Sequence, residues 1–174
     1  YLKITYRMKR IAIHLLLLVS VLGASSSQAD TRLLTRLDIL DAWENNFNAS
    51  HWLEQGNLQS GCQMYGEEAV TITSLPAMLE GADWIQTAYG SKSFVKWTEG
   101  PVIAYFTLKH AADVYILHND AITNKPAWLD AYIEVPGRMT NSYGESFSLY
   151  RRRALAGERV ALGPNGSTRE GMYI

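Results

Sequence analysis

Short runs of β-branched and aromatic residues recur from about His51 onward, at intervals of roughly 8 to 15 residues. Clusters of Gly, Pro, Asn and Ser separate them. Strands this short, with little helix between them, predict an all-β fold, an antiparallel β-sandwich of jelly-roll-like type. The chain has one cysteine, Cys62. No disulfide can form within the chain, so the core must hold the fold together, and we expect Cys62 to be an inert thiol.

The predicted strands share alternating or continuous apolar character and end at turn-forming residues. They are Ala69–Leu75, Asp83–Ala88, Ser93–Thr98, Val102–Leu108, Asp113–Leu117, Ala131–Val135, Ser146–Ala154, Arg159–Leu162 and Gly171–Ile174. Val102–Leu108 and Asp113–Leu117 flank a short polar turn and predict a hairpin. Both faces of this pair are apolar, which favours a buried position. Gly171–Ile174 looks like the beginning of a strand, and whether the 51–174 sandwich is truncated there stays open.

Residues 30–50 form a lead-in with a different pattern. Leu33, Leu37 and Leu40 follow helical spacing, and Leu34 and Trp43 add apolar bulk. A short amphipathic helix and an irregular segment are both compatible with this pattern. No change in composition marks a second domain within residues 30–174.

Residues 1–29 have the layout of an upstream extension and a secretory signal peptide. From Met8, the basic pair Lys9 and Arg10 precedes an apolar run over Ile11–Leu22, and small residues lead to Ala29. We therefore expect translation to start at Met8, cleavage after Ala29 and a secreted or periplasmic location. The apolar run is too short to cross a hydrocarbon core of roughly 30 Å as a helix. A retained membrane anchor is the alternative.

The charge of the mature segment argues against nucleic acid as a partner. The leader contributes Lys3, Arg7, Lys9 and Arg10, so its removal takes the formal charge from −1 to −5. Affinity for phosphate backbones comes from Lys and Arg that displace counterions. The run Arg151–Arg153 lies on a predicted strand, where neighbours point to alternate faces and form no single basic patch. We expect no membrane contact after cleavage.

Motifs for common catalytic and metal sites are absent. The sequence contains neither Gly-x-Ser-x-Gly nor His-Glu-x-x-His. The histidines of the mature segment, His51, His110 and His118, are far apart and lack neighbours at metal-ligand spacing. We therefore assign no catalytic residue, no cofactor and no zinc site. Structural calcium is compatible with a β-sandwich, but no Asp-rich loop marks a site for it.

The polar segment after the Asp113–Leu117 strand is the best candidate for binding. Loops at the end of a rigid sandwich often carry binding groups. A sugar needs hydrogen-bonding groups for its hydroxyls and an aromatic face for stacking. The competing interpretation is structural, with Asx turns ending the strand and a buried Trp pinning the loop. The candidate residues are His118, Asn119, Asp120, Lys125 and Trp128, joined by Trp84, Tyr89 and Lys92 from the preceding region.

Three segments carry a family resemblance over roughly Leu58 to Ile174. They read TITSLPAMLEGADWIQTAYGSK, ADVYILHNDAITNKPAWL and SFSLYRRRALAGERVALGPNG. Together they resemble an accessory, carbohydrate-binding-module-like β-sandwich of secreted bacterial polysaccharide-degrading proteins. The resemblance implies a non-catalytic role near glycans, with polysaccharide and an adjacent catalytic domain as the partners to expect. It supplies no catalytic set.

Two other functions compete with this expectation. A small secreted polysaccharide lyase or glycosidase would need two carboxylates, or a Tyr with a neutralising Arg or Lys, in a cleft. Convergence of Tyr150 with Arg151 or Arg153 and an acid would favour it. A structural domain that packs on a neighbouring catalytic domain would instead show a large flat apolar patch.

Overall fold

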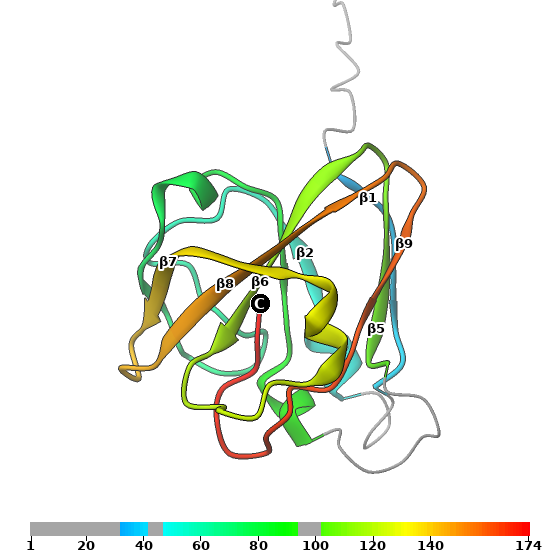
Figure 1. Cartoon of the computed structure of the whole chain (residues 1–174). Coiled ribbons are helices and arrows are strands. Elements are labelled where there is room, and N and C mark those ends of the chain that lie inside the picture. The colour runs from blue at the N-terminus through cyan, green and yellow to red at the C-terminus, as the bar shows by residue number, and fades with distance from the viewer. Residues whose placement is uncertain (1–31, 42–46, 94–101) are drawn as a thin grey trace, which may run out of the picture. The chain divides into compact units, whose positions relative to one another are not determined.

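A computed structural model describes residues 32–41, 47–93 and 102–174 of the unit that spans 31–174 (Figure 1). The predicted signal peptide, Trp43 and most of the predicted strand Ser93–Thr98 lie outside the described residues. None of the helices in the described ranges has the length and apolar character needed to cross a bilayer.

The described part of the chain folds as an antiparallel all-β sandwich, which confirms the predicted fold class. Its sheets have the strand orders β1-β5-β9, β2-β4 and β3-β7-β8-β6. The strands are β1 (Leu34–Ile39), β2 (Leu53–Gln55), β3 (Ile72–Ser74), β4 (Trp84–Gln86), β5 (Ala104–Leu108), β6 (Ala112–Asn119), β7 (Ile133–Asn141), β8 (Ser146–Ala154) and β9 (Arg159–Leu162). Helical residues form only short 3-10 turns, η1 (Asn48–His51), η2 (Ala77–Leu79), η3 (Tyr89–Ser93) and η4 (Ala127–Ala131).

One continuous core fills the sandwich, as the lack of a disulfide requires. Its largest fully buried side chains come from strands and from the segments between them. Burial of such residues removes apolar surface from water and supplies the main favourable free energy of folding. They include Tyr65, Phe147, Met64, Met139 and Leu149.

The predicted hairpin of Val102–Leu108 and Asp113–Leu117 is wrong. Both strands exist, but β5 pairs with β1 and β9, whereas β6 pairs with β8. The connection between β5 and β6 therefore carries the chain from one sheet to the other (Figure 1). The apolar pattern predicts that each strand is buried, but it does not predict which strand it pairs with. A strand that is apolar on both faces can pair with several neighbours.

Two elements differ from the pattern-based expectations and two agree closely. The lead-in contributes β1, a strand that pairs with β5, where the sequence left a short helix or an irregular segment open. Strand β7 begins at Ile133 and continues to Asn141 through a bulge, although Pro136-Gly137 was expected to end it. Strands β8 and β9 have the predicted bounds.

The final residues of the chain lie inside the molecule, held by hydrogen bonds from several elements. The Gly171 N–H donates to Glu145 Oε1 at 2.9 Å, and Thr87 Oγ1 donates to the Tyr173 carbonyl at 2.8 Å. Ile174 and Leu117 exchange two backbone hydrogen bonds, of 3.3 and 2.8 Å. The predicted strand Gly171–Ile174 is thus an extended, buried segment with one strand-like pair beside β6, where Figure 1 marks the C-terminus.

Candidate functional site

A bulge in β7 aligns polar side chains across three neighbouring strands. Glu134 lies opposite Tyr150 before the bulge. The bulge leaves Pro136 and Gly137 unpaired, so Arg138 lies opposite Ser148. On the other side of β8, Ser148 lies opposite His118 of β6. Alternate residues of a strand share a face, so Glu134, Arg138, Tyr150 and His118 all belong to one face of the sheet.

Asp120 lies at the end of β6, where β8 holds its carboxylate. Ser146 Oγ donates to Asp120 Oδ2 at 2.7 Å, and Ser148 Oγ donates to Oδ1. Arg138 Nε is 3.3 Å from Oδ2. Burial favours a higher pKa for Asp120, but the two hydroxyl hydrogen bonds and the charges of Arg138 and Lys125 prevail and lower the pKa of this carboxyl. Asp120 is therefore a fixed anion at neutral pH.

Lys125 is held from beneath by the two residues that precede Asp120. Its Nζ donates to the Asn119 carbonyl at 2.9 Å and to His118 Nδ1 at 3.2 Å. His118 Nε2 lies 2.9 Å from the Asn165 carbonyl, which only a protonated Nε2 can satisfy. Burial, with a further contribution from the Lys125 charge, lowers the pKa of His118 to about 4. The imidazole is thus neutral at pH 7 and fixed as the tautomer that accepts from Lys125.

The solvent-facing side of this network carries charged side chains, whereas the neutral His118 and Asn119 form its buried side. Arg138 Nη2 is 3.6 Å from Glu134 Oε1, and both side chains are about half exposed, at 52% and 51%. Burial raises the pKa of Tyr150, and the negative charges of Glu134 and Asp120 raise it further, so its hydroxyl stays protonated. We call Asp120, Lys125, Glu134, Arg138 and Tyr150 the Lys125 patch.

Of the residues predicted on the loop after β6, some reach solvent and some do not. His118 and Asn119 are fully buried, whereas Asp120, Lys125 and Trp128 are half-buried. Trp128 Nε1 donates to the Pro164 carbonyl at 2.8 Å. The structure therefore brings His118, Asn119, Asp120 and Lys125 together, with the first two beneath the surface.

The three remaining predicted residues belong to other parts of the molecule. Trp84 lies on β4 and lines an apolar cavity. Lys92 Nζ lies 3.6 Å from the centre of the Tyr89 ring and donates to the Arg169 carbonyl at 3.2 Å. No hydrogen bond or ring contact between described residues joins Tyr89 or Lys92 to the Lys125 patch.

Sequence reasoning missed Glu134, Arg138 and Tyr150 as companions of Asp120. They were missed because Pro136-Gly137 is typical of a strand end, so the sequence predicts that the strand stops before Arg138. Gly137 adopts φ +130, a value in the region that favours glycine, and the strand continues beyond it. Continuation of the strand through this pair would have placed Glu134 and Arg138 on one face, because alternate residues share a face.

The arrangement expected for a lyase does not form around Arg151 or Arg153. Both lie on the face of β8 opposite to Tyr150, by strand alternation. Arg153 pairs with Asp113 at 3.7 Å, and Arg152 donates to Glu158 at 2.6 Å. Within the described ranges, no group of three His, Cys, Asp or Glu side chains is positioned to hold a metal ion.

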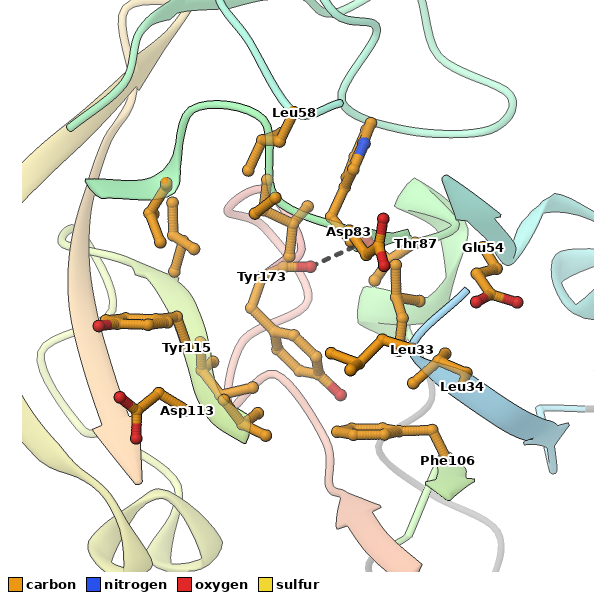
Figure 2. Close-up of a pocket in the computed structure, with 18 of the residues that line it drawn as sticks. Leu33, Leu34, Glu54, Leu58, Asp83, Thr87, Phe106, Asp113, Tyr115 and Tyr173 are labelled. Carbon is orange, nitrogen blue, oxygen red and sulfur yellow. Dashed lines mark hydrogen bonds between the residues drawn. The ribbon is translucent and has the colours of Figure 1, made fainter. Parts of the chain in front are cut away.

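A separate apolar cavity of about 320 Å³ lies along β6 (Figure 2). Figure 2 shows Asp113 and Tyr115 at one side, Leu33 and Leu34 at the other, and Tyr173 between them. The lining is mainly aliphatic and aromatic, with a few carboxylates. A pocket of this size falls at the lower end of the range for small-molecule sites, but it lacks converging polar groups.

Comparisons with known proteins show a similarity of fold. No family model matches the chain, and a search of the curated proteins finds no match. Among solved structures, the chain is similar to a β-glucuronidase from glycoside hydrolase family 2, with 22% sequence identity and a TM-score of 0.59. The match covers 70% of this chain and 13% of that protein, so the chain corresponds to a small part of it. At this identity the likeness shows a shared sandwich fold.

Proposed function

We propose that this chain is a secreted, non-catalytic carbohydrate-binding module associated with polysaccharide degradation, and that the Lys125 patch contacts the glycan. The observation that carries the proposal is the alignment of Glu134, Arg138 and Tyr150 beside Asp120 and Lys125 on one sheet face. The likeness to part of a glycoside hydrolase supports a carbohydrate-related context. The resemblance of the sequence to accessory domains of polysaccharide-degrading proteins supports the same context.

The chemistry of the patch suits a sugar. Asp120 and Glu134 accept hydrogen bonds from hydroxyls, whereas Lys125, Arg138 and the Tyr150 hydroxyl donate to sugar oxygens. His118 and Asn119 act as positioning residues, because they are buried and fix Lys125 from beneath. The groups are partly exposed and compete with water, so we expect modest affinity.

An affinity-gel and calorimetry panel of neutral and uronic-acid-containing polysaccharides tests this proposal. Glu134→Gln and Arg138→Gln should each weaken binding about tenfold, because a hydrogen bond to a charged group contributes about 1.5–3 kcal/mol. Arg153→Gln is the matched control, since it makes the same change on the same sheet at a residue whose partner is Asp113. The assignment of the patch is wrong if no polysaccharide binds. It is also wrong if the two patch variants bind as tightly as the Arg153→Gln control.

A catalytic function is the alternative, and the surroundings of Tyr150 favour it over other enzyme arrangements. Tyr150 is within electrostatic range of two carboxylates and of Arg138, which is a combination that acid–base chemistry on a glycan uses. Chromatography of each polysaccharide after incubation with the protein separates the two functions. The catalytic function would be supported if the wild type releases new sugar products and if Tyr150→Phe binds the polysaccharide but releases none.

A further inference from the structure

The charged side chains of the Lys125 patch balance one another. Asp120 and Glu134 are carboxylates, whereas Lys125 and Arg138 are cations, so their formal charges cancel. Burial lowers the pKa of Lys125, and the charges of Asp120 and Glu134 oppose this shift. The charge of Arg138 lowers the pKa of Lys125 further, so all three groups lie within electrostatic range of this ammonium. The patch therefore offers a ligand no excess of positive charge.

Arg138, the group best suited to hold a ligand carboxylate, is already engaged with protein oxygens. Its Nε lies 3.3 Å from Asp120 Oδ2, and its Nη2 lies 3.6 Å from Glu134 Oε1. Its Nη1 donates to the Gly137 carbonyl at 3.0 Å. A guanidinium binds a carboxylate most strongly through two parallel N–H groups. Because each nitrogen of Arg138 faces a protein oxygen, only single N–H groups are left, and these suit a hydroxyl.

The polar groups left for a ligand are a donor on Lys125 and an acceptor on Glu134. Within the described ranges, Lys125 Nζ donates to two uncharged groups, the Asn119 carbonyl and His118, which leaves one of its three N–H groups. Glu134 is half exposed, and its Oε2 has no hydrogen-bond partner among the described residues. A sugar hydroxyl can accept from Lys125 and donate to Glu134. A ligand carboxylate can only accept, and the charge of Glu134 repels it.

We propose that the Lys125 patch selects neutral polysaccharides and that Glu134 is the specificity-determining residue that excludes uronic acids. This inference rests on the proposed carbohydrate-binding function and names its substrate class. Discrimination between related ligands commonly uses a repulsive group as well as attractive contacts. The formal charge of −5 on the predicted mature segment adds repulsion of a polyanion at longer range.

The test compares neutral polysaccharides with the same polymers after oxidation of their C6 hydroxymethyl groups to carboxylates. The probes are mixed-linkage β-glucan, galactomannan and pectic galactan, and the readout is affinity electrophoresis of the wild type. We expect at least one neutral polymer to bind and its oxidised form to bind about tenfold more weakly at low salt. Methyl esterification of the oxidised form removes its charge and should restore most of the affinity. High salt should narrow the difference, because it screens the repulsion.

The variant Glu134→Gln separates this residue from the overall charge. It should weaken binding of the neutral polymer, through loss of an acceptor, and should reduce the preference over the oxidised form to about threefold or less. Glu80→Gln is the matched control, since it makes the same change at an exposed residue outside the patch and should keep the tenfold preference. The ester and salt comparisons use the wild type and so do not depend on the folding of a variant.

Four results would overturn the inference. If an oxidised polymer binds as tightly as its neutral form or more tightly, the neutral selectivity is wrong while the carbohydrate-binding function stands. If no polymer binds, both are wrong. Equal loss of preference in Glu134→Gln and Glu80→Gln would assign the selectivity to the overall charge. Failure of the methyl ester to recover affinity would assign it to the missing hydroxyl instead of the repelled carboxylate.

Discussion

His118 accepts a hydrogen bond at Nδ1 from Lys125 Nζ, at 3.2 Å, while its Nε2 binds the Asn165 carbonyl at 2.9 Å. The imidazole therefore connects a half-buried ammonium group to the loop that follows β9. The centroid of its ring also lies 6.4 Å from that of Tyr150 and 6.4 Å from that of Tyr173. A histidine that looks from sequence like a surface ligand is thus a neutral support for the surface cation.

Acid should destabilise the protein through His118. The pKa of His118 is about 4 in the folded chain and about 6.5 in an unfolded chain. Between these values the unfolded state binds a proton that the folded state does not, so the free energy of unfolding falls as the pH falls. From pH 7 to pH 5 this group should remove about 2 kcal/mol. Urea unfolding of the wild type and of His118→Gln at both pH values checks this. The same loss in both proteins would contradict it.

Removal of the Lys125 charge should raise the pKa of His118. In Lys125→Met the repulsion between the ammonium and the imidazolium is gone, while burial of the ring, the larger cause of the low value, remains. We therefore expect the pKa of His118 to move upward but to stay below its ordinary value. Nuclear magnetic resonance titration of the imidazole measures it. Lys92→Met is the control, because Lys92 contacts Tyr89 and Arg169 instead, and it should leave the titration unchanged.

The sequence was sufficient to predict the fold class, because strand alternation and turn residues are local signals. Strands β8 and β9 are clear examples, since each has an apolar alternation and ends shortly before a Gly, Gly157 after β8 and Gly163 after β9. The pairing of β5 was not predictable in the same way. A strand that is apolar on both faces gives no register, and its partners β1 and β9 are far from it in sequence.

The candidate site was predictable only in part. Asp120 and Lys125 follow a strand end, which is a sequence signal for a binding loop. Glu134 and Arg138 join them because β7 continues through Pro136-Gly137 as a bulge, and this continuation is not readable from the two residue types alone. The burial of His118 likewise depends on the Asn165 loop and Tyr173, both distant in sequence.

Substitution of Gly163 or Gly171 by alanine should destabilise the fold, because other groups pack closely against the backbone at both positions. A Cβ on Gly163 would clash with the Trp128 ring, and one on Gly171 would lie 2.6 Å from the Tyr65 hydroxyl and 2.7 Å from Glu145. We expect each alanine variant to lose about 1–3 kcal/mol of stability through overpacking. Thermal and urea unfolding measure the loss. Gly56→Ala is the control, because its Cβ would meet Asp83 at an ordinary 3.4 Å. Unchanged stability of the Gly171 variant would show that the C-terminal segment is not packed this closely.

Glu145 should be the most sensitive carboxylate of the fold, since it joins three segments. Its Oε1 accepts from Asn119 Nδ2 at 3.0 Å and from the Gly171 N–H at 2.9 Å, and its Oε2 accepts from Asn141 Nδ2 at 2.7 Å. In Glu145→Gln the amide NH₂ must face at least one of these donors, which leaves buried donors without an acceptor. We expect a loss of about 2–3 kcal/mol in urea unfolding. Glu80→Gln is the control, because Glu80 is an exposed carboxylate. Amide exchange at Gly171 should also accelerate in Glu145→Gln and not in the control. If both variants unfold at the same urea concentration and Gly171 remains protected, Glu145 does not anchor the C-terminal segment beside β6.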